Sequence, residues 1–157
     1  MELEFAQKTA AELMAELSPA AKKVEVVGSV RRQRPIVHDI DLLIIPKNQG
    51  LLDTKLREMG CHFGGPKIRR LVYPRDMGAS VDIYIATLET WATLLLIRTG
   101  STRHNVYLCK RARARGWQLK ADGQGLVDDL GKRVAGDTEE SIFTALGLPF
   151  KPPEGRE

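Results

Sequence analysis

Residues 26–45, VVGSVRRQRPIVHDIDLLII, carry the pattern that decides the fold of the chain. The short, β-branched segment Val24–Val30 predicts a strand that ends in a turn at Gly28–Ser29. Nine residues separate this turn from Asp39–Ile45, which predicts a second strand. The continuous apolar end of the second strand indicates burial on both faces of a sheet. Acidic residues therefore stand at the start of a strand that is otherwise suited to burial.

Three aspartates on predicted strands form the candidate catalytic and metal-binding set. Asp39 and Asp41 point to one face because side chains alternate along a strand. Carboxylates this close repel each other unless a cation lies between them, and Mg²⁺ prefers oxygen ligands. Asp82, in the predicted strand Ala79–Ala86, can join them from a neighbouring strand. Such a set can hold two Mg²⁺ ions about 4 Å apart, with Mn²⁺ as a substitute, for in-line phosphoryl transfer.

The residues upstream of the aspartates distinguish this interpretation from a simpler one. A DxD pair alone is common and is compatible with solvated strand ends. Here Gly28 allows backbone amides to approach a ligand, and the Ser29 hydroxyl adds a donor. Arg31 and Arg32 follow directly, and guanidinium groups suit phosphate oxygens. The combination predicts a triphosphate-binding turn facing a pair of metal ions.

The segments around this pattern predict an α+β fold. For residues 1–88 we expect a mixed sheet of about four or five strands with helices on one side. Its further elements are helices at Leu3–Leu17 and Leu51–Met59 and strands at Lys67–Tyr73 and Ala79–Ala86. Residues 89–157 predict a smaller α/β subdomain. Its expected elements are a helix at Thr90–Arg98, a break at Thr99–Ser101, a helix to Gly116, short strands over 117–134, a helix from Asp137 or Thr138, and an extended tail.

Charge is distributed unevenly along a chain whose net charge is only +4. Between Thr90 and Ala121 there is no Asp or Glu. The cations in this window are Arg98, Arg103, Lys110, Arg111, Arg113, Arg115 and Lys120. A block of one sign favours a polyanionic partner such as nucleic acid over a merely solvated helix face, which normally carries interspersed Glu.

Composition excludes several classes of protein. The 157 residues are 43% hydrophobic, enough for a packed interior. No apolar run approaches the length of a membrane span, and the N-terminus has no apolar core of the signal-peptide type. Cys61 and Cys109 lack the spacing of a zinc site or a disulfide framework. His62 and His104 are expected as polar surface residues. We expect a cytoplasmic monomer without membrane association.

The order Gly-Ser, nine residues, DxD resembles the nucleotidyltransferase superfamily. The segment RTGSTRHNVYLCKRARARG (residues 98–116) is similar to the thumb of the family X DNA polymerases, the group of polymerase beta and the bacterial PolX enzymes. The ending TEESIFTALGLPFKPPEGRE (residues 138–157) is also similar to that family. The resemblance implies a nucleotidyltransferase palm over residues 1–88 and a thumb subdomain over residues 89–157.

The resemblance also implies roles for individual residues. Asp39 and Asp41 would bind both metal ions, and Asp82 the catalytic one near the primer hydroxyl. The nucleotide-binding residues would be Gly28, Ser29, Arg32, Thr99, Gly100, Ser101 and Asn105. The DNA-binding residues would be Arg98, Arg103, Lys110, Arg111 and Arg113.

The chain departs from the family pattern at several positions. Ile97 and Arg98 stand where the family usually has an aromatic pair that packs against the sugar and helps to exclude ribonucleotides. His38 replaces a Gly before the first aspartate, and Ser80 replaces an Arg that hydrogen-bonds the third. Cys109 replaces an arginine that contacts the template. No lyase or helix-hairpin-helix region precedes the palm in this sequence, so we expect weak, salt-dependent DNA binding or an accessory repair protein.

The expected function is template-directed DNA synthesis on gapped or primed DNA from nucleoside triphosphates, for short-gap filling in repair. A terminal or RNA nucleotidyltransferase with the same chemistry is the first alternative. A catalytically inactive nucleic-acid-binding module is the second.

Overall fold

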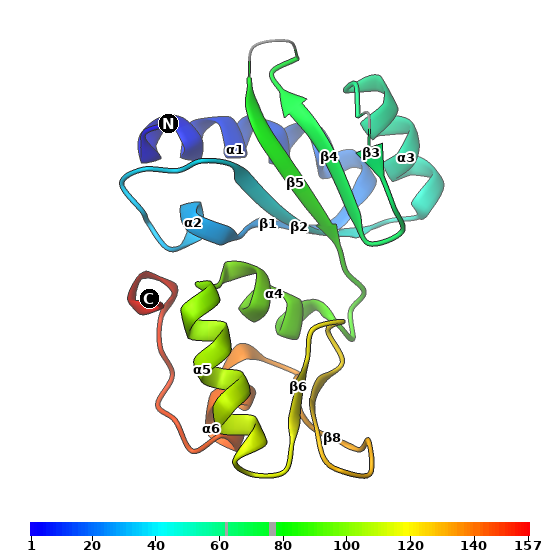
Figure 1. Ribbon diagram of the computed structural model, residues 1–157. Helices are drawn as coiled ribbons and strands as arrows, with labels where there is room; N and C mark the ends of the chain where they lie inside the picture. Colours follow the sequence, from blue (N-terminus) through cyan, green and yellow to red (C-terminus); the bar gives the residue numbers. More distant parts are fainter. Residues whose placement is uncertain (62, 76–77) are drawn as a thin grey trace. The chain divides into compact units, whose positions relative to one another are not determined.

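The computed structural model describes residues 1–61, 63–75 and 78–157, and the chain has a mixed α/β fold (Figure 1). It divides into two compact units, Met1–Ala86 and Thr87–Glu157.

A five-stranded sheet forms the centre of the first unit, with the strand order β1-β2-β5-β4-β3. Its strands are β1 (Ala21–Val26), β2 (Ile40–Pro46), β3 (Phe63–Gly64), β4 (Ile68–Tyr73) and β5 (Ala79–Ile85). The central pair, β2 and β5, is parallel, whereas the other neighbours are antiparallel. The mixed sheet expected from the sequence is confirmed, with the short strand β3 added.

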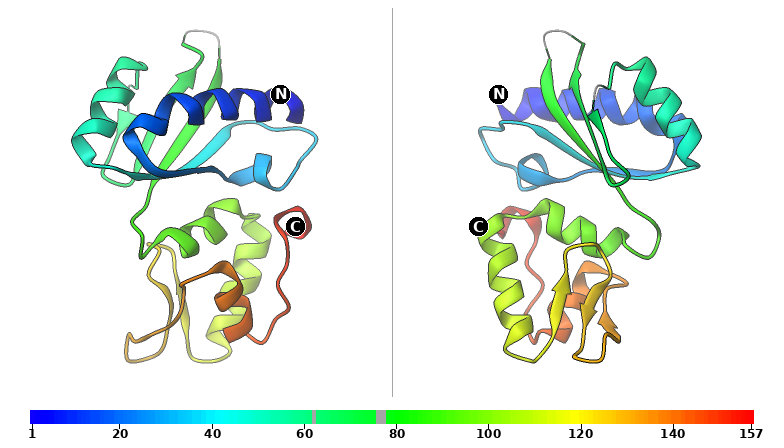
Figure 2. Two further views of the ribbon diagram at one scale, coloured as in Figure 1. Left: turned by 180° about the vertical axis from the view of Figure 1, so that it is seen from behind. Right: turned by 45° about the vertical axis from the view of Figure 1, so that its right-hand side comes forward.

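Helices α1 (Leu3–Leu17) and α3 (Gln49–Glu58) cover one face of this sheet (Figure 2). Helix α1 buries apolar residues at helical spacing, and Asn48 caps α3 by accepting a hydrogen bond from the Leu51 N–H at 2.8 Å. The core between helices and sheet consists of Ala10, Leu13, Leu17, Ile40, Leu42, Ile44, Leu52, Leu56, Leu71, Val81 and Ile83. The even-numbered residues of β2 therefore face the helices, and the odd-numbered residues face the opposite side.

The predicted strand Val24–Val30 is wrong in its second half. Strand β1 ends at Val26, and Gly28–Arg31 forms the short helix α2. Gly28 has φ +62°, a backbone conformation that a strand does not contain. The Val27 N–H still bonds the Asp41 carbonyl at 2.8 Å, and the chain then turns away from the sheet.

The second unit packs helices against a small antiparallel sheet. The helices are α4 (Trp91–Thr99), α5 (Thr102–Arg113) and α6 (Glu139–Ala145), and the strands are β6 (Gln118–Lys120), β7 (Gly125–Val127) and β8 (Arg133–Ala135). Their common core consists of Leu96, Leu108, Ala112, Leu119, Leu126, Ile142, Phe143 and Leu146.

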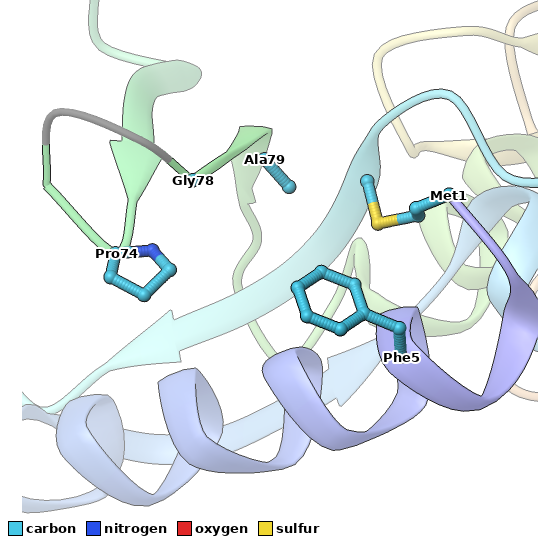
Figure 3. A pocket seen from close by; sticks show the side chains of 5 residues that line it. All are labelled: Met1, Phe5, Pro74, Gly78 and Ala79. Atoms are coloured by element: carbon cyan, nitrogen blue, oxygen red, sulfur yellow. The ribbon is translucent and has the colours of Figure 1, made fainter.

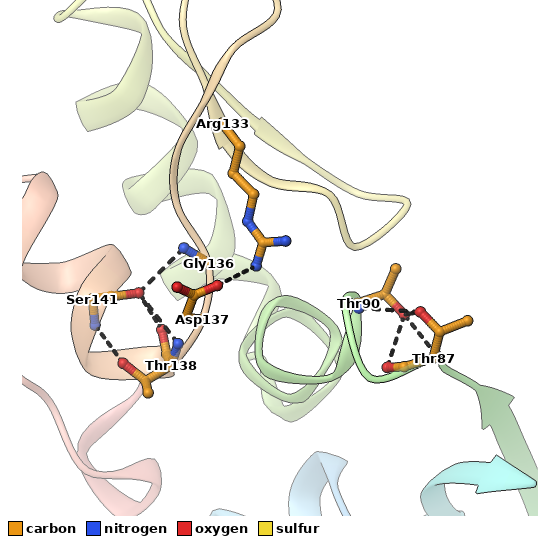
Figure 4. A network of polar contacts seen from close by, with 7 residues as sticks. All are labelled: Thr87, Thr90, Arg133, Gly136, Asp137, Thr138 and Ser141. Atoms are coloured by element: carbon orange, nitrogen blue, oxygen red, sulfur yellow. Dashed lines mark hydrogen bonds and ion pairs between the residues drawn. The ribbon is translucent and has the colours of Figure 1, made fainter.

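Side-chain hydrogen bonds fix the helix starts of this unit (Figure 4). Before α4, the Thr87 N–H donates to Thr90 Oγ1 at 2.9 Å. At α6, Thr138 and Ser141 form a reciprocal capping box, with the Ser141 N–H donating to Thr138 Oγ1 at 3.0 Å. The helix predicted from Asp137 or Thr138 therefore begins at Glu139, with Thr138 as its cap.

The C-terminal tail, expected to be extended, contains a 3₁₀ turn at Pro153–Gly155 and is fixed to the second unit by Arg156. This side chain is fully buried. It donates hydrogen bonds to Glu139 Oε1 at 2.8 Å and to the Lys151 carbonyl at 2.9 Å. Its guanidinium also lies over the ring of Phe143. Within the described residues, no helix has the length and apolar character needed to cross a membrane.

Candidate active site

Asp41 and Asp82 are direct register partners on the parallel strands β2 and β5. Their neighbours Ile40, Leu42 and Val81 belong to the core beneath the helices, so both carboxylates lie on the other face of the sheet. Parallel pairing thus brings together two residues that are 41 positions apart in the sequence. Asp39, two residues before Asp41, is exposed at the entry to β2.

The pKa of Asp41 is raised by its burial and by the neighbouring carboxylates. Burial, followed by the negative charges of Asp39 and Asp82, raises the pKa of Asp41 to about 6. A hydrogen bond from Tyr84 and the positive charge of Arg32 act in the opposite direction without cancelling the effect. The fold therefore keeps a carboxylate where its charge is incompletely compensated by the protein.

The Gly28 turn lies directly against the Asp41 carboxyl group. A Cβ atom at Gly28 would overlap Asp41 Oδ2, so only glycine fits both this contact and the positive φ. Beside it, Ser29 Oγ is buried and has no hydrogen-bond partner among the described residues. Arg32 lies close enough for Asp41 to raise its pKa, although burial and the charge of Arg34 lower it overall. The predicted association of the Gly-Ser turn, Arg32 and Asp41 is therefore present in the structure.

Asp82 has a cationic partner that the sequence did not indicate. Arg70 is its register partner on the antiparallel strand β4, and Arg70 Nε donates to Asp82 Oδ1 at 3.0 Å. The side chain of Arg70 is 57% exposed and that of Asp82 only 16%. Ser80, where the family resemblance would place an arginine for this aspartate, is exposed. The departure at Ser80 is thus accompanied by an ion pair from the neighbouring strand.

The donors fit a divalent cation in their chemistry. Within the described residues there is no group of three or more His, Cys, Asp or Glu side chains arranged to hold a metal ion. Asp39, Asp41 and Asp82 are nevertheless oxygen donors of like charge, and oxygen donors of this kind are the ligands that Mg²⁺ prefers.

In the second unit, the break at Thr99–Ser101 joins α4 to α5. Ser101 Oγ caps α5 by accepting from the His104 N–H at 3.2 Å. Asn105 Nδ2 donates to the Ile97 carbonyl at 2.8 Å, while its Oδ1 is buried and has no partner among the described residues. The Asn105 amide thereby ties the end of α4 to α5 and leaves an acceptor unused.

Helix α5 separates its apolar and basic residues. His104, Leu108 and Ala112 recur every four positions and are buried. The cations predicted to bind DNA are all exposed: Arg98 on α4, and Arg103, Lys110, Arg111 and Arg113 on α5. Tyr107 and Val106 are exposed on the same helix, 45% and 46% respectively. The exposed face of α5 is therefore basic with an aromatic ring among the cations.

His104 corrects a sequence prediction, because it is 2% exposed rather than at the surface. Its ring lies 5.8 Å from that of Phe143, between centroids. Burial, with the charges of Arg156 and Lys151, lowers the pKa of His104 to about 4, so it packs as a neutral ring. The prediction for His62 lies outside the described residues.

An apolar pocket of about 350 Å³ lies elsewhere on the first unit (Figure 3). It is lined by Met1, Phe5, Pro74, Gly78 and Ala79. None of the predicted site residues is among them, so this pocket is separate from the carboxylates.

Known proteins resemble both units. The family model "DNA polymerase beta thumb" matches residues 94–157. Over 145 residues the chain is 29% identical to the DNA polymerase/3′-5′ exonuclease PolX of Bacillus subtilis (strain 168), covering 86% of the chain and 24% of that protein. It is 28% identical to DNA polymerase lambda of Rattus norvegicus, covering 83% of the chain and 28% of that protein.

A solved structure agrees with these matches. The fold is similar to that of Leishmania infantum polymerase beta in a ternary P/T complex, with a TM-score of 0.83 and 20% identity. The similarity covers 100% of the chain and 76% of that structure. The chain spans about a quarter of the length of the two curated relatives. The resemblance to the family X DNA polymerases seen in the sequence is confirmed by these matches.

Proposed function

We propose that the chain is a nucleotidyltransferase that extends a primer 3′-hydroxyl on gapped or primed DNA. The observation that carries this proposal is that Asp41 lies beside Asp82 on the neighbouring strand and against the Gly28 turn. Burial and the neighbouring carboxylates raise the pKa of Asp41 to about 6, and divalent ions are the cations that bind clustered carboxylates. The relatives that match the sequence are DNA polymerases.

The chain's own residues would supply positioning and charge. Residues 1–88 would act as the palm and residues 89–157 as the thumb. Asp39, Asp41 and Asp82 would hold two Mg²⁺ ions, which when bound lower the pKa of the attacking hydroxyl and offset charge on the phosphates. Asp82 would accept the proton of the primer hydroxyl or orient it, and Arg32 would neutralise a phosphate oxygen.

Each unit carries residues predicted to contact the nucleotide. The predicted contacts are Gly28, Ser29, Arg32, Thr99, Gly100, Ser101 and Asn105. The unsatisfied polar atoms Ser29 Oγ and Asn105 Oδ1 support a ligand at two of these positions, because buried polar atoms normally have partners. The cations on the exposed face of α5 would bind the DNA phosphates without reading its sequence.

One observation favours an alternative acceptor or nucleotide. Ile97 and Arg98 follow the helical pattern of α4 and place no aromatic side chain before Thr99. A terminal or RNA nucleotidyltransferase therefore remains the second candidate. An inactive nucleic-acid-binding module is disfavoured because it has no use for repelling carboxylates.

Primer extension on a duplex with a one-nucleotide gap tests the proposal. Each dNTP and each NTP is offered separately with Mg²⁺ or Mn²⁺ at low salt, and Asp82→Asn serves as the inactive control. Addition of only the template-complementary nucleotide is the expected result. Untemplated addition would support the terminal transferase, and binding without any addition would support the binding module.

A further inference from the structure

We propose that Arg70 is a positioning residue for Asp82, holding one carboxylate oxygen so that the other is presented to a bound cation. This inference rests on the proposed function. It names a residue of the site on a strand, β4, that carries none of the predicted catalytic residues.

The strand register places Arg70 beside Asp82. Arg70 and Asp82 are register partners on antiparallel strands, so the backbone fixes their separation before any side chain moves. The contact joins Arg70 Nε to Asp82 Oδ1 at 3.0 Å. An N–H donor directed at this carboxylate oxygen orients the plane of the Asp82 carboxyl group.

Arg70 and Asp82 differ in their exposure to solvent. The Arg70 side chain is 57% exposed, so its ion pair adds little to the stability of the fold. Asp82 is only 16% exposed and is the register partner of Asp41 on the neighbouring strand. A long, exposed side chain directed onto this carboxylate therefore acts on the site and not on the core.

Arg69, the neighbour of Arg70 on β4, makes a different ion pair. Arg69 precedes Arg70, points to the other face of β4, and bonds Asp53 on α3 at 2.9 Å. One arginine thus ties the sheet to a helix, while the next is directed at the carboxylates. Arg69 is a matched control, because it lies on the same strand and loses an ion pair of the same kind.

Ser80 offers a rescue. It lies two residues before Asp82 on β5 and is exposed, so its side chain projects from the same face as the carboxylate. An arginine at this position can reach Asp82 along its own strand. The double variant Arg70→Ala/Ser80→Arg therefore replaces the ion pair from a different direction.

Binding of Mn²⁺ alone, titrated by the electron paramagnetic resonance signal of the free ion, is the first measurement. Steady-state primer extension with Mn²⁺ is the second, and a thermal melt verifies folding. In Arg70→Ala we expect Mn²⁺ affinity and kcat to fall roughly 10- to 100-fold, the usual effect of losing an outer-shell partner. The KM for the nucleotide should stay nearly unchanged, and Ser80→Arg should recover most of both losses.

Arg69→Ala should melt at a lower temperature with unchanged Mn²⁺ affinity and kcat. Unchanged or tighter Mn²⁺ binding in Arg70→Ala would overturn the inference, because Arg70 would then be a bystander or a competing charge. Loss without recovery in a folded double variant would also overturn it. Should the wild-type chain fail to extend any primer, the proposed function fails, while the Mn²⁺ titrations still decide the role of Arg70.

Discussion

The two units use charge in opposite ways. The first unit places Asp41 and Asp82 side by side on a sheet, and the pKa of Asp41 rises to about 6. The second unit pairs its buried charges, Arg156 with Glu139 at 2.8 Å, and has a surplus of cations on the exposed face of α5. Like charges in a partly buried site cost stability, whereas like charges on a solvated helix cost little. This difference supports the proposed chemical site in the first unit and the proposed DNA-binding surface in the second.

The largest expected effect on the contrast between the two units follows from substitution of Asp41. Asp41→Asn removes a proposed cation ligand while nearly preserving the volume of the side chain. We expect primer extension to fall by more than about 100-fold, the upper range for residues that act only through another ligand. Steady-state rates on the one-nucleotide-gapped duplex measure this effect. Activity within tenfold of the wild type would remove Asp41 from the site.

The buried pair of the second unit gives the largest expected change in stability. Arg156→Ala leaves Glu139 buried beside a cavity, and we expect a loss of about 3–5 kcal/mol in the free energy of unfolding. Arg133→Ala is the matched control, since its ion pair with Asp137 at 3.3 Å has a partner that is 96% exposed. The control should change stability by less than about 0.5 kcal/mol. Equal effects in urea unfolding would contradict the contrast between buried and exposed pairs.

Much of this comparison could be predicted from local sequence. The run DIDLLII gave β2 and the two aspartates, and the acid-free window gave the exposed cations of α4 and α5. Local patterns failed where tertiary contacts decide. The valines around Gly28 favour a strand, but the positive φ of Gly28 and its contact with Asp41 impose a turn into α2. His104 has a polar side chain, yet its spacing from Leu108 on α5 places it in the core.

The side chains that bond Asp41 and Asp82 could be predicted from local sequence only in part. Tyr84 follows Asp82 by two residues, so strand alternation could have placed it on the same face. Arg70 could not be found in this way, because its pairing with Asp82 depends on the register between β4 and β5. That register is set by the length of the connection and by the packing of both strands. The proposed metal ligands could thus be predicted from the sequence, whereas Arg70, the residue proposed to orient one of them, could be found only in the fold.

The raised pKa of Asp41 predicts that the stability of the chain depends on pH. Because the pKa of Asp41 in the folded chain, about 6, lies above the ordinary value of an aspartate, protonation of this group favours folding. Its contribution is fully present below about pH 4 and is lost as the pH rises through 6. Asp41→Asn should therefore gain stability relative to the wild type across this window, on the order of 1–3 kcal/mol, and the gain should level off above it. Unfolding curves without metal from pH 4 to 8 test this, and a constant difference would refute it.

The smallest expected effect concerns the exposed face of α5. Arg111→Ala removes one cation from an exposed position, so the free energy of unfolding should change by less than about 0.5 kcal/mol. The plot of log binding constant against log salt concentration for duplex DNA should become shallower by about 0.9, the contribution of one phosphate contact. Lys132→Ala, an exposed cation of the same unit outside the acid-free window, should leave the slope unchanged. Equal slopes for both variants would mean that net charge alone governs DNA binding, and the basic face of α5 would lose its assigned role. A fall confined to Arg111→Ala would instead place the phosphates at α5, because only a local contact releases a counterion at one site and not at another.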